Sequence, residues 1–206
     1  MTYNDITNKN SPRFNTTPLQ AVLLLIILLG SPYLFYSLNS GITITNDGSH
    51  FALFDSLVTT GSPELQHVRQ FAFNDSAKYK GRYYSDRNPG LALATYSLYQ
   101  GFRPLEGWMK PLKLDPKMAR RYSEGQKSRA TIVMLVPSIC GSLLILAIFT
   151  LARQLGTGFY ASLLTALAIV FGTIAFRYAT LFYSHIFSAT LLTWGLILLF
   201  SYRTNM

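Results

Sequence analysis

Four stretches of the chain are apolar and contain no Asp, Glu, Lys or Arg. They are residues 19–38, 130–152, 154–176 and 178–202, and the last of them contains one histidine. An α-helix rises about 1.5 Å per residue, so roughly twenty apolar residues cross the hydrocarbon core of a membrane. The pattern therefore predicts about four transmembrane helices, and the predicted fold class is an α-helical integral membrane protein.

The polar segments between these stretches give the domain organisation. Residues 1–18 are rich in Asn and Thr, which predicts a disordered N-terminal tail. Residues 19–38 are transmembrane helix 1; a cleaved signal peptide is a poorer interpretation, because the apolar run is long and no A-x-A site follows it. A long loop occupies residues 39–129, and residues 130–206 hold transmembrane helices 2–4.

The long loop has a helical periodicity of its own. The apolar residues that recur at helical spacing near its start are Phe51, Phe54, Leu57 and Val58. With polar residues largely on the other positions, segment 46–60 is predicted to be a short amphipathic helix that lies in the plane of the membrane interface. Asp47 or Asn46 is placed as its N-cap, and Gly61 as its end.

A second helix is predicted over SDRNPGLALATYSLYQGF, residues 85–102, with Asn88 as N-cap and Pro89 as the first helical residue. Its predicted apolar stripe consists of Leu91, Ala94, Thr95 and Leu98, and Gly101 is its predicted end. A third helix is predicted from LDPKMARRY, with Asp115 as its cap. Between the first two helices, a short β-hairpin is predicted, with strands near 68–73 and 79–84 and a turn around 74–76.

Composition agrees with a membrane protein and narrows the expected partners. Half of the residues are hydrophobic and 13% are charged, whereas about a quarter of a soluble chain is charged. The net charge is +9, and many of the bases lie in residues 103–129. Beside membrane spans, such a stretch favours anionic lipid headgroups or a lipid phosphate over nucleic acid, which is not an expected partner. A solvated basic loop is the alternative interpretation.

The basic residues near the ends of the spans favour one orientation by a small margin. Those that favour a cytoplasmic N-terminus are Lys9, Arg13, Arg153 and Arg203. Arg177, Arg129 and the basic stretch 103–129 favour the opposite orientation. We therefore expect a multi-pass protein of the plasma (inner) membrane, with its N-terminus in the cytoplasm and loop 39–129 external.

Several sequence motifs follow one another in an order that resembles a known family. Asp-Gly-Ser-His-Phe-Ala opens a helix after the first span, and Tyr-Tyr-Ser-Asp-Arg-Asn-Pro-Gly opens a second helix. LARQLG ends a later span, and FGTIAFRYATLFYSHIFSATLLTWGLILL follows. From about residue 19 onward, the chain resembles the N-terminal part of the GT-C membrane glycosyltransferases of the protein mannosyltransferase and aminoarabinose transferase type (family 39-like).

The resemblance implies a polyprenyl-phosphate-linked sugar as donor and transfer of a hexosyl or pentosyl group at the outer membrane face. In this family an acidic residue of the first external loop acts as general base or orients the acceptor, and Asp47 matches that position. Basic residues of the loop hold the lipid phosphate. Some members bind a divalent metal ion near the acid; which residues of this chain would be its ligands is left open.

The candidate site residues follow from this chemistry. The predicted catalytic residues are Asp47 and Asp86, and the predicted substrate-binding residues are His50, Arg82, Arg87, Arg177 and His185. Arginine can hold a leaving phosphate through two parallel hydrogen bonds, and a general base must lie within hydrogen-bonding distance of the acceptor proton. The alternatives are structural: a helix cap for Asp47, an interhelical hydrogen bond for each histidine, and an interface anchor for Arg177.

The expected function is therefore a glycosyltransferase, or an N-terminal fragment of one. Family members carry eight or more spans, so we expect a further membrane chain, or the remainder of such an enzyme, to complete the lipid cavity. The alternative is a noncatalytic multi-pass membrane subunit of a larger complex derived from such an enzyme. The sequence contains no Cys/His metal cluster, no P-loop and no G-x-S-x-G motif that would suggest other chemistry.

Overall fold

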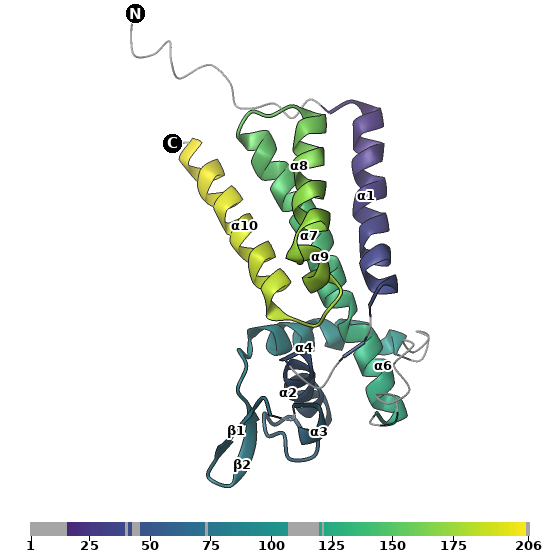
Figure 1. Ribbon diagram of the computed structural model, residues 1–206, viewed down its shortest axis with the longest axis vertical. Coiled ribbons are helices and arrows are strands. Elements are labelled where there is room, and N and C mark those ends of the chain that lie inside the picture. Colours follow the sequence, from purple (N-terminus) through teal and green to yellow (C-terminus); the bar gives the residue numbers. More distant parts are fainter. Residues whose placement is uncertain are drawn as a thin grey trace, which may run out of the picture.

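The chain folds into two helical parts in a computed structural model, which describes residues 16–39, 41–42, 46–72, 74–106, 120 and 122–204. The bundle consists of α1 (Pro18–Ser37), α7 (Leu135–Gln154), α8 (Phe159–Gly172), α9 (Ile174–Ala179) and α10 (Ser184–Thr204). The cap consists of α2 (Asn46–Thr60), α3 (Arg69–Ala72), β1 (Ser76–Tyr79), β2 (Arg82–Ser85), α4 (Gly90–Phe102), the 3-10 helix η2 (Arg103–Leu105) and α6 (Glu124–Val133). Figure 1 shows the cap below one end of the bundle. Residues 1–15 of the predicted tail and the predicted cap Asp115 lie outside the described residues.

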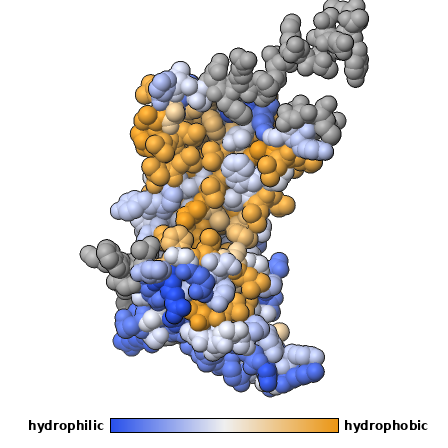
Figure 2. Space-filling view, turned by 180° about the vertical axis from the view of Figure 1, so that it is seen from behind, coloured by the Kyte–Doolittle hydropathy of each residue, from blue (hydrophilic) through white to orange (hydrophobic). Residues whose placement is uncertain are grey.

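Three helical segments in the described part of the chain are long and apolar enough to cross a membrane. They are Pro18–Ser37, Glu124–Gln154 and Ser184–Tyr202. In the structure, 72% of the 18-residue apolar stretch of the middle segment is buried, against 11% for the first segment and 17% for the last. The outer faces of α1 and α10 therefore expose leucine and isoleucine, and Figure 2 shows this apolar surface over the bundle, above a hydrophilic cap. Such a surface suits lipid.

The third predicted span differs from the prediction. Residues 154–176 were expected as one helix, but α8 ends at Gly172, where Thr173 is extended with φ −126° and ψ −178°. The Thr173 hydroxyl then accepts a hydrogen bond from the Ala175 N–H and starts α9. By itself α8 is only about 21 Å long. The fourth predicted span also begins later than residue 178, because the chain turns through 180–183 before α10 starts at Ser184.

Helix α7 is the centre of the bundle, and small side chains let its neighbours approach it closely. A Cβ atom on Gly141 would lie 2.7 Å from the Ala179 Cβ and 2.9 Å from a ring carbon of Phe35. The hydroxyls of Ser31 on α1 and Ser142 on α7 are 2.7 Å apart and buried. Close backbone approach at small residues, with hydroxyl hydrogen bonds between helices, is typical of helix association in membranes.

Helix α2 is the centre of the cap, and its burial corrects one prediction. Its bounds, Asn46–Thr60, agree with the predicted segment 46–60. Residues 47–56, however, are all buried, because α3, α4, α6 and β2 pack around the helix. It is therefore not an amphipathic helix lying flat on the membrane. Since it begins at Asn46, Asp47 is in its first turn rather than before it.

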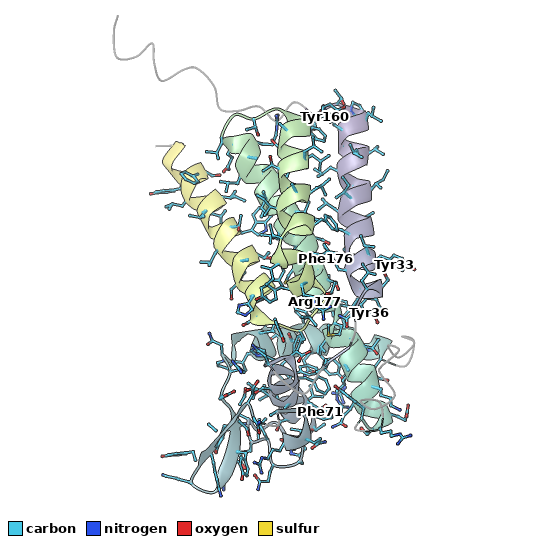
Figure 3. All side chains as sticks on the ribbon, viewed as in Figure 1. Tyr33, Tyr36, Phe71, Tyr160, Phe176 and Arg177 are labelled. Atoms are coloured by element: carbon cyan, nitrogen blue, oxygen red, sulfur yellow. The ribbon has the colours of Figure 1, made fainter. Side chains whose placement is uncertain are left out.

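Aromatic rings fill the core of the cap. The rings of Phe51 and Phe71 meet edge to face at 5.3 Å, and those of Phe54 and Tyr99 do so at the same distance. Tyr122 packs on Phe71 at 4.7 Å and donates its hydroxyl proton to the Ile42 carbonyl oxygen. Edge-to-face pairs of this kind stabilise beyond the area that they bury. Figure 3 shows Phe71 inside the cap, well away from the bundle.

The predicted hairpin exists, but its position is corrected. Residues 69–72 of the predicted first strand form α3, and the strands are β1 and β2, with Ser76 opposite Ser85. The turn is at Lys80 and Gly81, which both have positive φ, 47° and 80°. Two consecutive residues with positive φ form the type I′ turn that matches the twist of a hairpin. The predicted turn residue Asp75 instead precedes β1.

Helix α4 also differs in detail from its prediction. It begins at Gly90 with Pro89 as N-cap, so Asn88 does not cap it, and it ends one residue after the predicted end, Gly101. Its buried residues are Leu91, Ala92, Thr95 and Tyr99. The predicted stripe residue Leu98 is exposed instead, because the face that meets α2 is centred nearer to Tyr99. The burial of this face fixes the segment that precedes α4 against the rest of the cap.

A charged contact joins two helices of the cap, α2 and α6, and α6 leads directly into α7 of the bundle. The Arg129 Nε donates to the Asp55 Oδ1 at 2.5 Å, and Gln126 donates to the other carboxylate oxygen at 2.9 Å. Asp55 is completely buried, although it lies in the segment that was predicted to be an interfacial helix. Because α7 follows α6 after a single turn residue, Met134, this contact also fixes the cap relative to the bundle.

Candidate functional site

An open pocket lies where the cap meets the beginning of α10. Its volume is about 480 Å³, and it is lined by Asn46, His50, Asp86, Arg87, Asn88, Pro89, Ser184 and His185. Apart from Pro89, each lining residue carries a polar or charged side chain, so the pocket suits a polar ligand.

Three helix N-termini converge on the pocket. Asn46 is the first residue of α2, Pro89 is the N-cap of α4, and Ser184 is the first residue of α10. The free N–H groups of a helix N-terminus carry a partial positive charge, roughly half an elementary charge per helix, that favours anions. The first turns of α4 and α10 contain no acidic residue, whereas Asp47 occupies the first turn of α2.

Arg87 is the cation of the pocket, and the segment around the hairpin holds it. Its Nη2 lies 2.8 Å from the Asp75 Oδ2, and its Nε lies 3.4 Å from the Asp86 Oδ1 without hydrogen-bond geometry. The hydrogen bond to Asp75 is the main reason why the pKa of Arg87 is raised. The Arg87 N–H donates to the Ser85 hydroxyl, which also contacts the hydroxyl of Ser49 on α2.

His50 brings an unpaired buried nitrogen to the pocket. The residue is 1% exposed, and its Nδ1 has no hydrogen-bond partner in the described part of the chain. Burial, and then the positive charge of Arg87 and the neighbouring His185, lower the pKa of His50 to about 4, although Asp75 opposes the shift. His50 is therefore a neutral imidazole at physiological pH.

His185 forms the opposite wall, near the start of α10. Its ring packs on Tyr178 with centroids 4.6 Å apart and meets Tyr183 edge to face at 6.1 Å. These contacts hold the imidazole at the boundary between cap and bundle. The two histidines of the pocket therefore come from different parts of the molecule, His50 from the buried helix of the cap and His185 from the bundle.

The pocket gathers four of the seven residues that the sequence singled out: His50, Asp86, Arg87 and His185. The other three lie elsewhere. Asp47 is completely buried and does not line the pocket, and its Oδ1 accepts a hydrogen bond from the Gly48 N–H. Arg82 is on the hairpin, 62% exposed and paired with Glu64. Arg177 is exposed on α9, and Figure 3 shows it beside Phe176, near the end of α1 that carries Tyr33 and Tyr36.

Some residues of the site were missed in the sequence. Asn46 and Asn88 were interpreted only as helix caps, and Ser184 carried no signal at all. Asp75, which holds Arg87, was placed in a hairpin turn. The one available signal was the preference of tight turns for glycine. It favours a turn at Lys80–Gly81, and a hairpin that turns there leaves Asp75 outside the turn.

The donor set does not by itself assemble a metal site. In the part of the chain that the structure describes, no group of three or more His, Cys, Asp or Glu side chains is placed to hold a metal ion. Asp86, the pocket's carboxylate, faces the Arg87 guanidinium. The divalent metal ion of some GT-C enzymes therefore does not fit these residues alone, and no step below depends on one.

No family model matches the chain, and no match was found among curated proteins or solved structures. The resemblance to GT-C glycosyltransferases therefore stays a prediction that depends on the sequence motifs. What the pocket can do chemically follows from its own groups: a guanidinium and helix N-termini for an anion, amide and carboxylate groups for hydroxyls, and a neutral imidazole.

Proposed function

We propose that this chain is a GT-C-like glycosyltransferase, or an N-terminal fragment of one, that binds a polyprenyl-phosphate-linked sugar in the pocket. The observation that carries the proposal is the convergence of His50, Asp86, Arg87 and His185 at the boundary between cap and bundle. These residues come from separate motifs of the chain, and each was a candidate site residue on chemical grounds; Asp47, the residue that the resemblance matches to the family's acid, does not line the pocket. A pocket at a membrane surface also suits a substrate that is half lipid and half sugar phosphate.

In this proposal the chain crosses the membrane four times. α8 and α9 together form the third crossing, with the break at Thr173 inside it, and α1, α7 and α10 form the others. Figure 1 shows that the start of α1, the turn after α7 and the end of α10 lie at the end of the bundle opposite the cap, and in this proposal that end is on the cytoplasmic side of the plasma membrane. Arg153 lies at that turn, as the positive-inside rule favours. The cap is then external.

The pocket residues divide into two groups. Arg87, His185 and the N-termini of α4 and α10 hold the phosphate, because a guanidinium and free backbone N–H groups are the donors that phosphate oxygens prefer. Asp86, Asn46 and Asn88 bind sugar or acceptor hydroxyls. Asp47 does not line the pocket and positions the start of α2. Arg177 contacts lipid headgroups near the end of α1, and Arg82 stabilises the hairpin.

The reaction is a displacement at the anomeric carbon. The acceptor oxygen attacks this carbon, and the bond to the phosphate oxygen breaks, so that negative charge grows on the leaving lipid phosphate. Arg87, the N-cap residue of α4 and the first residue of α10 line the pocket, and fixed donors at such positions are an effective source of transition-state stabilisation. The acceptor also gives up a proton as the new bond forms.

A second candidate function is a noncatalytic subunit of a larger membrane complex. It is favoured by the outer faces of α1 and α10, of which little is buried within this chain. A further membrane chain could pack there. The same contact would complete the lipid cavity of an enzyme, so the exposed faces support a partner under either function.

Binding of farnesyl phosphate, a short isoprenoid phosphate, to the purified protein in lipid nanodiscs tests the proposal. We expect farnesyl phosphate to bind more tightly than either farnesol or inorganic phosphate. Arg87→Met should weaken its binding by about tenfold to a hundredfold, the range for a lost hydrogen bond to a charged group. Arg82→Met is the matched control and should bind like the wild type, since Arg82 is outside the pocket.

Equal binding by wild type and Arg87→Met would contradict the proposed site. Sugar release from a radiolabelled polyprenyl-phosphate sugar, by the chain with any membrane protein that copurifies with it, distinguishes the two functions. Release that Arg87→Met abolishes supports the enzyme; farnesyl phosphate binding with no release by the reconstituted complex supports the subunit.

The orientation has its own test. In a Cys140→Ala background, Lys80→Cys at the hairpin turn should react with an impermeant thiol reagent in intact cells. Thr157→Cys, in the turn between α7 and α8, should react only after lysis. The reverse labelling pattern would place the cap in the cytoplasm.

A further inference from the structure

We propose that His50, rather than a carboxylate, takes the proton from the acceptor group in the pocket. This inference rests on the proposed function and gives His50 a more specific role than substrate binding. His50 lines the pocket with a ring that is almost completely buried, and its Nδ1 has no hydrogen-bond partner among the described residues. A buried polar nitrogen left unpaired beside a pocket is uncommon and is typically explained by a bound water, ion or ligand.

The groups that surround His50 keep its imidazole uncharged. Arg87 faces it from the segment between β2 and α4, and His185 faces it from α10. The nearby carboxylates are Asp75, Asp86 and, on the same helix, Asp47. Asp75 favours the protonated form, but burial and Arg87 outweigh it, so the pKa of His50 is lowered to about 4. His50 also lies near the N-terminus of α2, where a cation is unfavourable. At neutral pH the ring is therefore uncharged and its lone pair is available, and the same surroundings make it a weaker base than a free imidazole.

The neighbouring carboxylates are less well placed for this step. Asp75 is bound to Arg87 at 2.8 Å and does not line the pocket. Asp86 does line it, but one of its oxygens lies 3.4 Å from the Arg87 Nε. Asp47 is buried, does not line the pocket and holds the Gly48 N–H. Of the two imidazoles that line the pocket, His50 is the one with a buried ring nitrogen that has no partner among the described residues. In this proposal His50 takes the proton and Arg87 holds the phosphate.

The proposed step balances. The acceptor O–H bond breaks, and its proton goes to an imidazole nitrogen of His50. The acceptor oxygen forms a bond to the anomeric carbon, and the electron pair of the carbon–oxygen bond to phosphate leaves with the lipid phosphate. The protonated imidazole is disfavoured beside Arg87, so it passes its proton to the leaving phosphate or to water before the next turnover.

Histidine-selective NMR tests the state of His50 without requiring turnover. The chain has three histidines, His50, His67 and His185, so the variants His50→Gln, His67→Gln and His185→Gln assign each resonance. In nanodiscs, the His50 ring should stay neutral through pH 5, and its resonance should shift on addition of farnesyl phosphate with methyl mannoside. His67, which contacts the Thr59 hydroxyl outside the pocket, is the control and should not shift. A His50 ring that titrates near its usual pKa, or that ignores the ligands while they bind, would overturn the inference.

Chemical rescue then separates a proton acceptor from a structural residue. His50→Gln should lower the rate of sugar transfer to a hydroxyl acceptor by about a hundredfold or more while farnesyl phosphate binding stays near the wild-type value. Azide needs no deprotonation, so transfer to azide should be restored in His50→Gln. Asp86→Asn should not be rescued by azide, because Asp86 binds hydroxyls.

The two proposals fail in different ways. Transfer that survives His50→Gln with an unchanged pH profile, or azide rescue of Asp86→Asn instead, would overturn the role of His50 while the enzyme function stands. Farnesyl phosphate binding that is indifferent to Arg87→Met would overturn the proposed function, and the role of His50 would be overturned with it.

Discussion

The cap and the bundle are each organised around one enclosed helix, but they are held together differently. Around α2, the cap packs large rings such as Phe51, Phe54 and Tyr99, and it buries the ion pair of Asp55 with Arg129. Around α7, the bundle brings helices together at Gly141 and at hydroxyl contacts such as that of Ser31 with Ser142.

The difference is the one expected if water surrounds the cap and lipid surrounds the bundle. Water drives the aromatic side chains of the cap together, because burial of apolar surface is favourable by roughly 25 cal/mol per Å². Lipid offers a leucine the same environment as another helix does, so the bundle gains little from hydrophobic burial and depends on close fit and on hydrogen bonds. The exposed leucines of α1 and α10 are consistent with this view, since they would find suitable contacts in lipid.

The largest expected effect is in the cap. Arg129→Met leaves the completely buried Asp55 carboxylate without its cation and should destabilise the cap by about 3–5 kcal/mol. The double variant Asp55→Leu with Arg129→Met should recover most of this loss, because no unpaired charge remains. Hydrogen exchange of peptides from α2, measured by mass spectrometry, reports the change. Slow exchange of α2 in the single variant would mean that the ion pair contributes little.

The stability of the cap should also depend on pH, and that of the bundle should not. The pKa of His50 is lowered to about 4 in the folded chain, against about 6.5 when unfolded, so the unfolded state binds the extra proton between these values. Stability should therefore fall as the pH drops from 6.5 to 4, by at most about 3 kcal/mol, and then level off.

His50→Gln should remove that pH dependence, and His67→Gln, on the surface of the cap, should not. Exchange rates of α2 and α7 peptides between pH 7.5 and 4.5, corrected for intrinsic exchange, make the comparison. Equal pH dependence in both parts of the molecule would contradict the assignment to His50.

In the bundle, the test is to disrupt the close approach of α1 and α9 to α7 at Gly141. Gly141→Ala adds a Cβ that would overlap Phe35 and Ala179, so either α1 or α9 must shift, at a cost of about 1–3 kcal/mol. Gly195→Ala on α10 is the matched control, because no atom lies within 4 Å of its added Cβ. Thermal unfolding in detergent should show a lower midpoint for Gly141→Ala and an equal or higher one for Gly195→Ala.

The smallest effect is expected for a single hydroxyl. Ser142→Ala removes the hydrogen bond to Ser31 and should destabilise the bundle by about 0.6 kcal/mol, the average for such bonds in membranes. Denaturation by SDS titration measures it. A loss several times larger would mean that polar contacts hold the bundle as strongly as the ion pair holds the cap.

The periodicity of the sequence predicted the helices better than it predicted which segments pack around them. It gave the bounds of α2, because apolar spacing and the stop at Gly61 are local signals. It did not show that α2 is buried on all sides, since that depends on α4 and α6, which lie far away in the chain. The break at Thr173 was also missed, because Gly-Thr inside an apolar run carries no strong helix-stop signal.

The site was partly predictable for a similar reason. The sequence indicated four residues of the pocket, because charged and imidazole side chains near membrane spans are uncommon and usually have a function. They are His50, Asp86, Arg87 and His185. Asp75 was missed because its partner depends on where the hairpin turns, and the Lys80–Gly81 turn needs an uncommon left-handed lysine. Pairings between distant segments, such as Asp55 with Arg129, follow from packing and leave no local trace in the chain.

The walls of the pocket come from two segments that the ribosome makes at different times. Asn46 to Pro89 supply one wall, and Ser184 with His185 supplies the other, so the pocket is complete only after α10 has inserted beside the cap. A molecule that fills it recognises the finished assembly alone and shifts the population toward it by mass action. Such a compound would serve as a pharmacological chaperone for variants that assemble slowly, and its fluorescence on binding would time the docking of α10 against the cap.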